Sequence, residues 1–128
     1  MSFEERKVRE IMLDRQKMTF VNEADFLGPL TLDRLYKSGF ADFPVVNEKE
    51  EIVGILHTEA LNALTIRETD QAKNYLDTKI QYLGEEDSLE VMRESLVNGT
   101  SSYFLVRDAE GVVTGCVNVK MLLDFLLG

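Results

Sequence analysis

Residues 38–57 read SGFADFPVVNEKEEIVGILH, and this stretch decides the fold. It contains two short apolar runs, Phe43 to Asn47 and Ile52 to Leu56, which the polar residues 48–51 separate. Apolar runs on either side of a polar turn predict a β-hairpin. Because glycine readily adopts the left-handed backbone that closes helices, Gly39 predicts the end of a helix just before this hairpin.

The same pattern of glycines and apolar segments recurs later in the chain. At an offset of about 60 residues, Gly99 falls on Gly39 and Gly115 falls on Gly54. Each copy offers an opening strand, an amphipathic helix that ends at the first glycine, a hairpin and a second helix. The sequence therefore predicts two β-α-β-β-α repeats.

Local signals place the elements of the first copy. The opening strand is expected at Met18 to Val21. A helix is expected to begin at Gly28-Pro29, because proline at the first helical position loses no needed hydrogen bond. A short helix from about His57 to Leu64 should follow the hairpin.

The second copy begins with an opening strand at Gln81 to Leu83. Asp87, with Glu90 three residues on, has the spacing of a capping box, which predicts the start of a helix. Gly99 is expected to close this helix as Gly39 closes the first.

The second hairpin is expected from Tyr103 to Arg107 and from Val112 to Val117. In the last helix, apolar residues follow the i, i+3, i+4, i+7 rule, which predicts a stripe that faces the core. The stripe consists of Val119, Leu122, Leu123 and Leu126.

The fold class is therefore α/β, in the α+β sense. A lone repeat of this size buries too little surface to be stable, so the two repeats should pack pseudo-symmetrically into one body. The predicted organisation is an entry helix and the first repeat over residues 1–66, a linker over 67–78 and the second repeat over 79–128. In the entry helix, Val8, Ile11 and Met12 share one face.

Composition narrows the setting and the partners. The formal net charge of −9 disfavours binding to nucleic acid, because phosphates would be repelled. The single Cys116 cannot form an internal disulfide, which fits a reducing, cytoplasmic setting. No apolar run approaches the roughly 20 residues of a membrane span. We expect no insertion of this chain into a membrane, and its start can be natural or the cut end of a longer protein.

Several segments, taken in order, resemble the family of CBS (cystathionine β-synthase type) domain pairs, or Bateman modules. VREIM at residues 8–12 resembles the opening segment of the family, and SGFADFPVV at 38–46 resembles its central segment. GILH at 54–57 is similar to the closing segment of the CorC and CNNM (hemolysin-like) subgroup. YFLVRD at 103–108, followed by Gly111 and Gly115, also resembles that subgroup.

The resemblance implies a regulatory module rather than an enzyme. Family members commonly bind adenine nucleotides such as AMP or ATP in clefts between the repeats, and they commonly form homodimers through their helices. CorC-type modules lie on the cytosolic side of a membrane transport domain. The resemblance therefore implies AMP or ATP, with Mg, as a regulatory ligand and no required cofactor. A single histidine without a partner cannot build a metal site, so no metal site is expected.

This chain departs from the nucleotide motif of the family, G-h-x-[TS]-x-x-D, in both copies. His57 and Asn118 take the threonine position, while Ala60 and Met121 take the position of the aspartate that accepts ribose hydroxyls. Losing a charge-assisted contact of about 1.5–3 kcal/mol weakens binding by roughly tenfold or more. The alternative is thus a structural dimerisation module whose nucleotide clefts are degenerate.

Eight residues are candidates for lining a ligand cleft: Phe43, Pro44, His57, Thr58, Ser101, Ser102, Asn118 and Lys120. Each has a plainer structural interpretation. His57 faces a ligand phosphate or simply begins a helix, and Thr58 donates to a ligand or caps that helix. Ser101 and Ser102 line a cleft or are polar loop residues. Lys120 contacts an anionic ligand or points to solvent.

Three hypotheses follow. The chain binds a small anionic ligand that biases the positions of the repeats, or it serves dimerisation with an empty cleft, or it is the cytosolic part of a CorC-like transport protein. Catalysis has no support, because the sequence has no glycine-rich phosphate loop, no nucleophile turn and a single histidine. No catalytic residue is assigned.

Overall fold

The computed structural model describes residues 2–61, 65–99 and 101–128. The chain divides into two compact units. The central unit is Thr19–Ile80, and the terminal unit combines Met1–Met18 with Gln81–Gly128. Each unit contains one β-sheet and its own helices, so each is described separately below.

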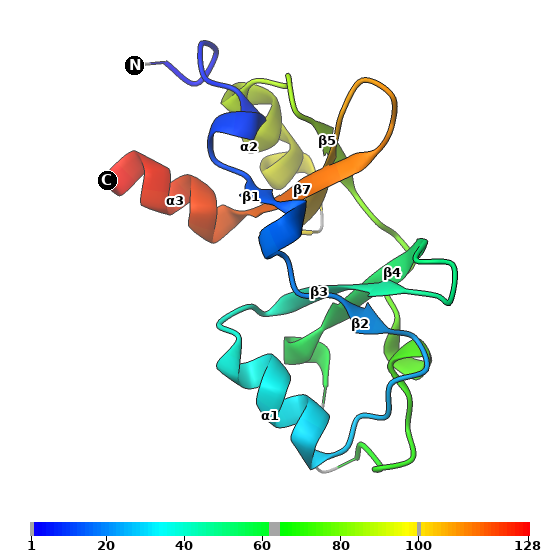
Figure 1. Cartoon of the computed structure of the whole chain (residues 1–128). Coiled ribbons are helices and arrows are strands. Elements are labelled where there is room, and N and C mark those ends of the chain that lie inside the picture. The colour runs from blue at the N-terminus through cyan, green and yellow to red at the C-terminus, as the bar shows by residue number, and fades with distance from the viewer. Residues whose placement is uncertain (1, 62–64, 100) are drawn as a thin grey trace. The chain divides into compact units, whose positions relative to one another are not determined.

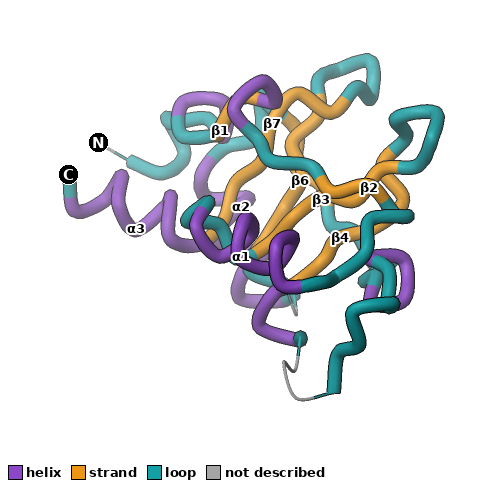
Figure 2. The backbone as a smooth tube through the Cα atoms, turned by 60° about the horizontal axis from the view of Figure 1, so that its bottom comes forward, coloured by secondary structure: helices purple, strands orange, loops and turns teal. Residues whose placement is uncertain are grey.

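The central unit is a three-stranded sheet in the order β2-β3-β4. Strand β2 (Val21–Asn22) runs parallel to β3 (Asp42–Val46), and β4 (Ile52–His57) runs antiparallel to β3. Helix α1 (Pro29–Lys37) connects β2 to β3 and lies beside the sheet (Figures 1 and 2). Two 3₁₀ turns complete the unit, η3 (Thr58–Ala60) and η4 (Ala72–Tyr75).

The terminal unit is a four-stranded sheet in the order β1-β7-β6-β5. Its elements are η1 (Val8–Glu10), β1 (Leu13–Asp14), η2 (Arg15–Lys17), β5 (Tyr82–Gly84), α2 (Leu89–Asn98), β6 (Tyr103–Arg107), β7 (Val113–Asn118) and α3 (Val119–Leu127). Strand β5 is parallel to β6, β6 is antiparallel to β7, and β7 is antiparallel to β1 (Figure 2).

The two units share one connectivity, which confirms the predicted repeat. Each has a strand, a helix, an antiparallel hairpin and a helical turn or helix in that order. Even the register repeats, since Val45 pairs with Gly54 just before a bulge, and Val106 pairs with Gly115 just before a bulge. The expected packing of the repeats into one pseudo-symmetric body stays a prediction.

Each unit has its own apolar core. In the central unit the buried core residues are Val21, Leu27, Leu35, Phe43, Val45, Leu56 and Ala72. In the terminal unit they are Val8, Leu83, Leu89, Met92, Phe104, Val106, Val117 and Leu122. In each core, apolar residues from both strands of the hairpin lie together with residues of a helix.

The residues just before each repeat pair with the second hairpin strand of the other repeat. These lead-in segments are residues 13–14 before the first repeat and residues 77–80 before the second. Residues 13–14, which precede the first repeat, form β1 and pair with β7. Asp77, which precedes the second repeat, pairs with Ile55 of β4 in an antiparallel bridge. Leu13 faces Cys116, whose counterpart in the first repeat is Ile55, so the two lead-in segments occupy matching places.

The two units therefore group the residues differently from the expected boundaries of 1–66, 67–78 and 79–128. Residues 1–18 belong with residues 81–128, because Val8 is fully buried in the terminal core and its N–H donates to the Asp87 carbonyl oxygen. Residues 67–78 belong with the first repeat, where Ala72 is buried. The apolar face of residues 8–12 predicted burial but carries no information on which repeat buries it.

The pairing of the lead-in segments with β4 and β7 explains why positions 54 and 115 are glycines. A β-carbon on Gly115 would lie 2.5 Å from the Leu13 carbonyl oxygen, and one on Gly54 would lie 3.1 Å from the Asp77 carbonyl oxygen. The lead-in backbone thus approaches the second hairpin strand too closely for a larger residue. This close approach accounts for one of the two glycine repeats read from the sequence.

The helix ends differ in part from expectation. Gly39 adopts a positive φ of 83°, as predicted for a helix closed by glycine. Gly99 ends α2 as predicted, and its N–H donates to the Ser95 carbonyl oxygen, but its backbone is extended, with φ −98°, and not left-handed. Glycine is needed there for space, because a β-carbon would lie 2.6 Å from the Ser95 carbonyl oxygen.

Three other local predictions need correction. The cap of α2 is Ser88, whose hydroxyl accepts from the Val91 N–H, while the Asp87 carboxylate accepts from the Gly84 N–H. The entry segment forms only the 3₁₀ turn η1 instead of a longer helix. The short helix expected after the first hairpin is the turn η3, and residues 62–64 lie outside the described part of the chain.

Replacing Gly115 with alanine tests the close approach of the lead-in backbone. The added methyl group forces β1 away from β7, so we expect Gly115→Ala to lower the free energy of unfolding by about 1–3 kcal/mol. Chemical denaturation measures this change. The control is Gly28→Ser, where a β-carbon meets no atom within 4 Å and serine is a favourable helix cap. Equal stability of both variants would contradict the assignment.

Candidate functional site

His57 lies at the end of β4, directly opposite Asp42 in the hairpin ladder. Its Nδ1 is 2.6 Å from the Asp42 Oδ1, and its Nε2 is 2.8 Å from the Asp77 Oδ2. The three side chains come from β3, β4 and the lead-in segment of the central unit. The imidazole is therefore bonded at both nitrogens by carboxylates.

Charge and burial act on this cluster in opposite directions. Burial lowers the pKa of His57, but the hydrogen bonds and negative charges of Asp42 and Asp77 outweigh it, so the pKa lies above its ordinary value of 6.5. The hydrogen bond from His57 holds the pKa of the Asp77 carboxyl below its usual value. Both directions favour a charged imidazolium between two carboxylates.

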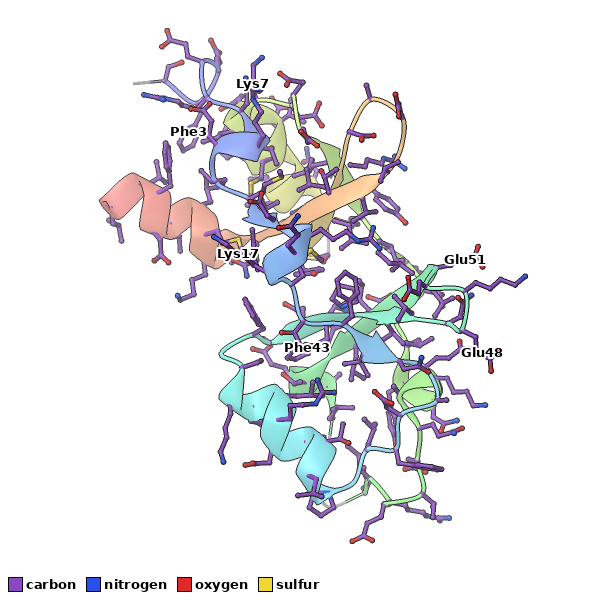
Figure 3. All side chains as sticks on the ribbon, in the orientation of Figure 1. Phe3, Lys7, Lys17, Phe43, Glu48 and Glu51 are labelled. Atoms are coloured by element: carbon purple, nitrogen blue, oxygen red, sulfur yellow. The ribbon has the colours of Figure 1, made fainter. Side chains whose placement is uncertain are left out.

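Of the other three candidates of the central unit, Phe43 and Pro44 lie on β3 and Thr58 begins η3. The Thr58 hydroxyl donates to the Ala41 carbonyl oxygen at 2.9 Å, and the Thr58 side chain is buried. Phe43 lies in the central core, with its ring edge-on to Phe40, and Pro44 follows it on β3 (Figure 3). Thr58 therefore fastens η3 to the start of β3.

The four candidates of the terminal unit lie around the start of α3. The Asn118 Oδ1 accepts from the Met121 N–H at 2.8 Å and caps the helix. The Ser102 carbonyl oxygen accepts from the Val119 N–H. The Ser101 hydroxyl accepts from the Tyr103 N–H and donates to the Tyr103 carbonyl oxygen. Lys120 is exposed.

Lys120 has a partner on its own helix. Its Nζ lies 3.4 Å from the Asp124 carboxylate, one turn further along α3. An exposed pair of this kind adds little to stability. Four of the eight predicted residues thus lie in each unit, and the ligand cleft expected between the repeats stays a prediction.

The two positions that replace the ribose aspartate have different surroundings. Ala60 is exposed at the end of η3. Met121 is partly buried and packs against the terminal core. Neither side chain has an acceptor oxygen for a ribose hydroxyl.

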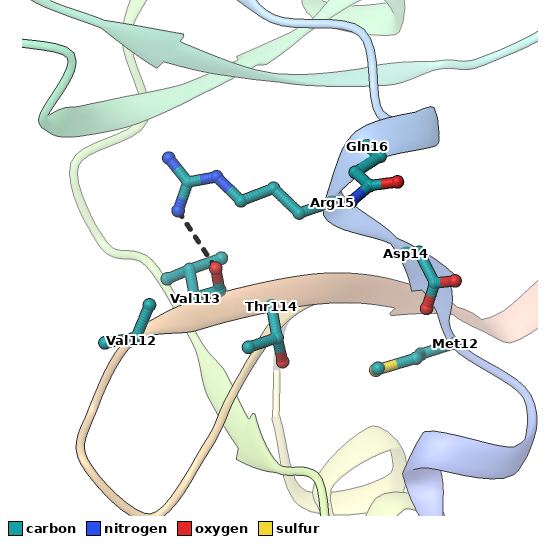
Figure 4. Close-up of a pocket in the computed structure, with 7 residues that line it drawn as sticks. All are labelled: Met12, Asp14, Arg15, Gln16, Val112, Val113 and Thr114. Carbon is teal, nitrogen blue, oxygen red and sulfur yellow. Dashed lines mark hydrogen bonds between the residues drawn. The ribbon is translucent and has the colours of Figure 1, made fainter.

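The terminal unit contains a hollow that the sequence did not predict (Figure 4). Its volume is about 580 Å³, and it lies between the lead-in segment and the start of β7. It is lined by Met12, Asp14, Arg15, Gln16, Val112, Val113 and Thr114. The Arg15 Nη1 donates to the Val113 carbonyl oxygen at 2.9 Å, which fastens η2 to β7. No residue type in the sequence signalled this hollow, because residues 12–16 were expected beside the first repeat.

The acidic turn at residues 48–51 is solvent-exposed in large part, and Glu48 and Glu51 lie on the β3–β4 turn (Figure 3). Within residues 2–61, 65–99 and 101–128, no group of three or more histidine, cysteine or acidic side chains is arranged to hold a metal ion. In the same described ranges, no helix has the length and apolar character needed to cross a membrane.

Comparison with known proteins gives matches among solved structures. The CBS domain of a putative transporter from Clostridium difficile 630 is 27% identical, with a TM-score of 0.82, over 100% of this chain and 98% of that one. The chain has the fold of a CBS domain pair. No protein-family model matches the chain, and no curated protein does so either.

Other solved structures with this CBS fold include transport-related domains. The CBS domain of a bacterial CNNM/CorC family Mg2+ transporter in complex with ATP is 20% identical, with a TM-score of 0.79, over 98% of this chain and 90% of that one. A hemolysin-like CBS protein of Oenococcus oeni PSU has the same identity and TM-score, over 98% and 93%. The resemblance to CBS domains, with CNNM/CorC members among them, is confirmed.

The cap of α3 offers a direct test of the local structure of the terminal unit. Asn118→Ala leaves the Met121 N–H without its acceptor, so we expect the free energy of unfolding to fall by about 1 kcal/mol. Asn118→Ser keeps an acceptor at the same position and should cost much less. Thermal and chemical denaturation of both variants measure this difference, and equal losses would contradict the capping role.

Proposed function

We propose that the chain is a regulatory CBS module that assembles with a second copy of itself through α3. The observation that supports this most strongly is an apolar stripe on the surface of that helix. Similar solved structures are CBS domains of transport-related and regulatory proteins rather than enzymes. The chain would then act by association and not by catalysis.

Helix α3 has two apolar faces. Leu122 is buried, and Met121 and Phe125 pack with it on the terminal core. On the outer face, Val119, Leu123 and Leu126 are 38%, 50% and 49% exposed. The sequence-based expectation that these three residues face the core with Leu122 is therefore wrong, because the inner face is formed by residues 121, 122 and 125.

The spacing of the outer residues suits pairing with another helix. Val119, Leu123 and Leu126 stand at i, i+4 and i+7, so their side chains form one continuous stripe. Exposed apolar stripes of this kind mark association surfaces. A second copy of the chain offers the same stripe, and a twofold axis through it makes the contact self-complementary.

Sedimentation of the purified chain across a range of concentrations tests the assembly. We expect a dimer for the natural sequence and a weaker dimer, by at least about tenfold in Kd, for Leu123→Glu, because two carboxylates would be forced into an apolar contact. Lys120→Gln changes a neighbouring exposed residue outside the stripe and should leave Kd unchanged. A strict monomer at high concentration, or equal Kd values for Leu123→Glu and the natural sequence, would contradict the proposal.

A second candidate function is regulation by an adenine nucleotide. The observation that favours it is the similar CNNM/CorC CBS domain, which is in complex with ATP. The ligand would be AMP or ATP, with Mg, and His57 and Asn118 take the threonine position of the family's nucleotide motif. The missing ribose aspartate implies weak binding, and the module would then act on the cytosolic side of a CorC-like transport protein.

Restoring the motif tests the nucleotide hypothesis. Ala60 is exposed, so Ala60→Asp should fold normally and supply the missing carboxylate. We expect it to tighten AMP or ATP binding by roughly tenfold or more, measured by thermal shift with and without magnesium. Ala60→Asn, which has the same shape without the charge, should gain less. No thermal shift at millimolar nucleotide in either the natural chain or Ala60→Asp would rule out this candidate.

A further inference from the structure

The cluster of Asp42, His57 and Asp77 joins three separate parts of the central unit. Asp42 begins β3, His57 ends β4, and Asp77 lies in the lead-in segment three residues before Ile80, where the unit ends. The bonds span 15 and 20 residues of sequence. The His57 imidazole therefore links the lead-in segment to both strands of the hairpin.

Asp77 makes the hydrogen bonds that hold the lead-in segment on β4. Its N–H donates to the Ile55 carbonyl oxygen and its carbonyl oxygen accepts from the Ile55 N–H, both at 2.9 Å. Its carboxylate receives the Lys79 N–H at 2.9 Å and the imidazole at 2.8 Å. One backbone bridge and one side-chain bond thus hold residues 77–80 on β4.

The chemistry of the imidazole makes this anchor depend on a proton. A carboxylate can only accept hydrogen bonds, and a neutral imidazole carries only one N–H. Both bonds of His57 can therefore exist together only when the ring is an imidazolium. After loss of the proton, one nitrogen presents a lone pair to a carboxylate oxygen less than 3 Å away, which is repulsive.

We propose that Asp42, His57 and Asp77 form a proton-operated latch that holds the lead-in segment Asp77–Ile80 on β4 while His57 is protonated and loosens it when His57 loses its proton. The latch concerns only the central unit, and it stands independently of assembly through α3 and of nucleotide binding. It would make the segment that continues into Gln81 sensitive to pH near neutrality.

The groups around the imidazole define the direction of this response. Burial lowers the pKa of His57, but Asp42 on β3 and Asp77 on the lead-in segment raise it above 6.5 overall. The hydrogen bond from His57, and then the one from the Lys79 N–H, lower the pKa of the Asp77 carboxyl. Glu59 on η3 is exposed. The latch is therefore closed from mildly acidic pH up to the raised pKa of His57, and it opens as the pH rises through that value.

The terminal unit lacks this device. Its matching hairpin pair is Tyr103 opposite Asn118, and Asn118 is used to cap α3. An amide does not titrate near neutral pH. The proton sensitivity is therefore confined to one of the two repeats, which provides an internal control.

The test uses the full chain, whose only histidine gives unambiguous imidazole signals in NMR. We expect the His57 pKa to lie above 6.5 and to fall in both Asp42→Asn and Asp77→Asn. Amide hydrogen exchange of Ile55 and Asp77, corrected for intrinsic rates, reports the bridge itself. Their protection factors should fall as the pH passes the His57 pKa, by about tenfold for each unit by which that pKa exceeds 6.5.

Two controls separate the latch from a general loss of stability. The Val119 amide, which donates to Ser102 in the terminal unit, should keep its protection over the same pH range. In His57→Gln, whose amide does not titrate, the protection factors of Ile55 and Asp77 should not change over that range. A His57 pKa at or below 6.5, or protection at Ile55 and Asp77 that ignores the titration in the natural chain, would overturn the proposal.

Discussion

The close approach of a lead-in backbone to the second hairpin strand is the constraint on which the rest of this fold depends. It occurs twice, beside Gly54 and beside Gly115, and in each case a β-carbon would enter the contact distance of a carbonyl oxygen. The contact closes the exposed edge of β4 or β7, which would otherwise offer unpaired backbone groups. Since each lead-in segment belongs in sequence to the other repeat, neither repeat is complete without residues from beyond its own boundaries.

The two repeats carry different side chains at equivalent positions of the same fold. At the end of the second hairpin strand, the first repeat has His57, which bonds two carboxylates, whereas the second has Asn118, which caps a full helix. The helix after Asn118 presents Val119, Leu123 and Leu126 outward, and the turn after His57 covers only Thr58–Ala60. An imidazole bonded to two carboxylates and an exposed apolar stripe thus follow equivalent strands of the two repeats.

The sequence predicted the features that depend on local chemistry. The hairpin around residues 48–51, the helix start at Pro29 and the left-handed Gly39 each follow from a few neighbouring residues. Burial of Val8 was predictable, but its partner was not, since an apolar face does not specify what it packs against. In α3 nearly every residue is apolar, so periodicity could not tell the face of Leu122 from that of Leu123. The partners of His57 were hidden because Asp42 and Asp77 lie far from it in sequence.

Hydrogen exchange at the start of the chain tests this account most directly. The N–H groups of Val8 and Arg9 donate to the carbonyl oxygens of Asp87 and Glu85, at 2.8 and 3.1 Å. If residues 1–18 are an integral part of the terminal unit, these two amides should exchange as slowly as the amides of β6, through unfolding of the whole unit. Rapid exchange at Val8 and Arg9, like that of a frayed chain end, beside slow exchange in β6 would contradict the account.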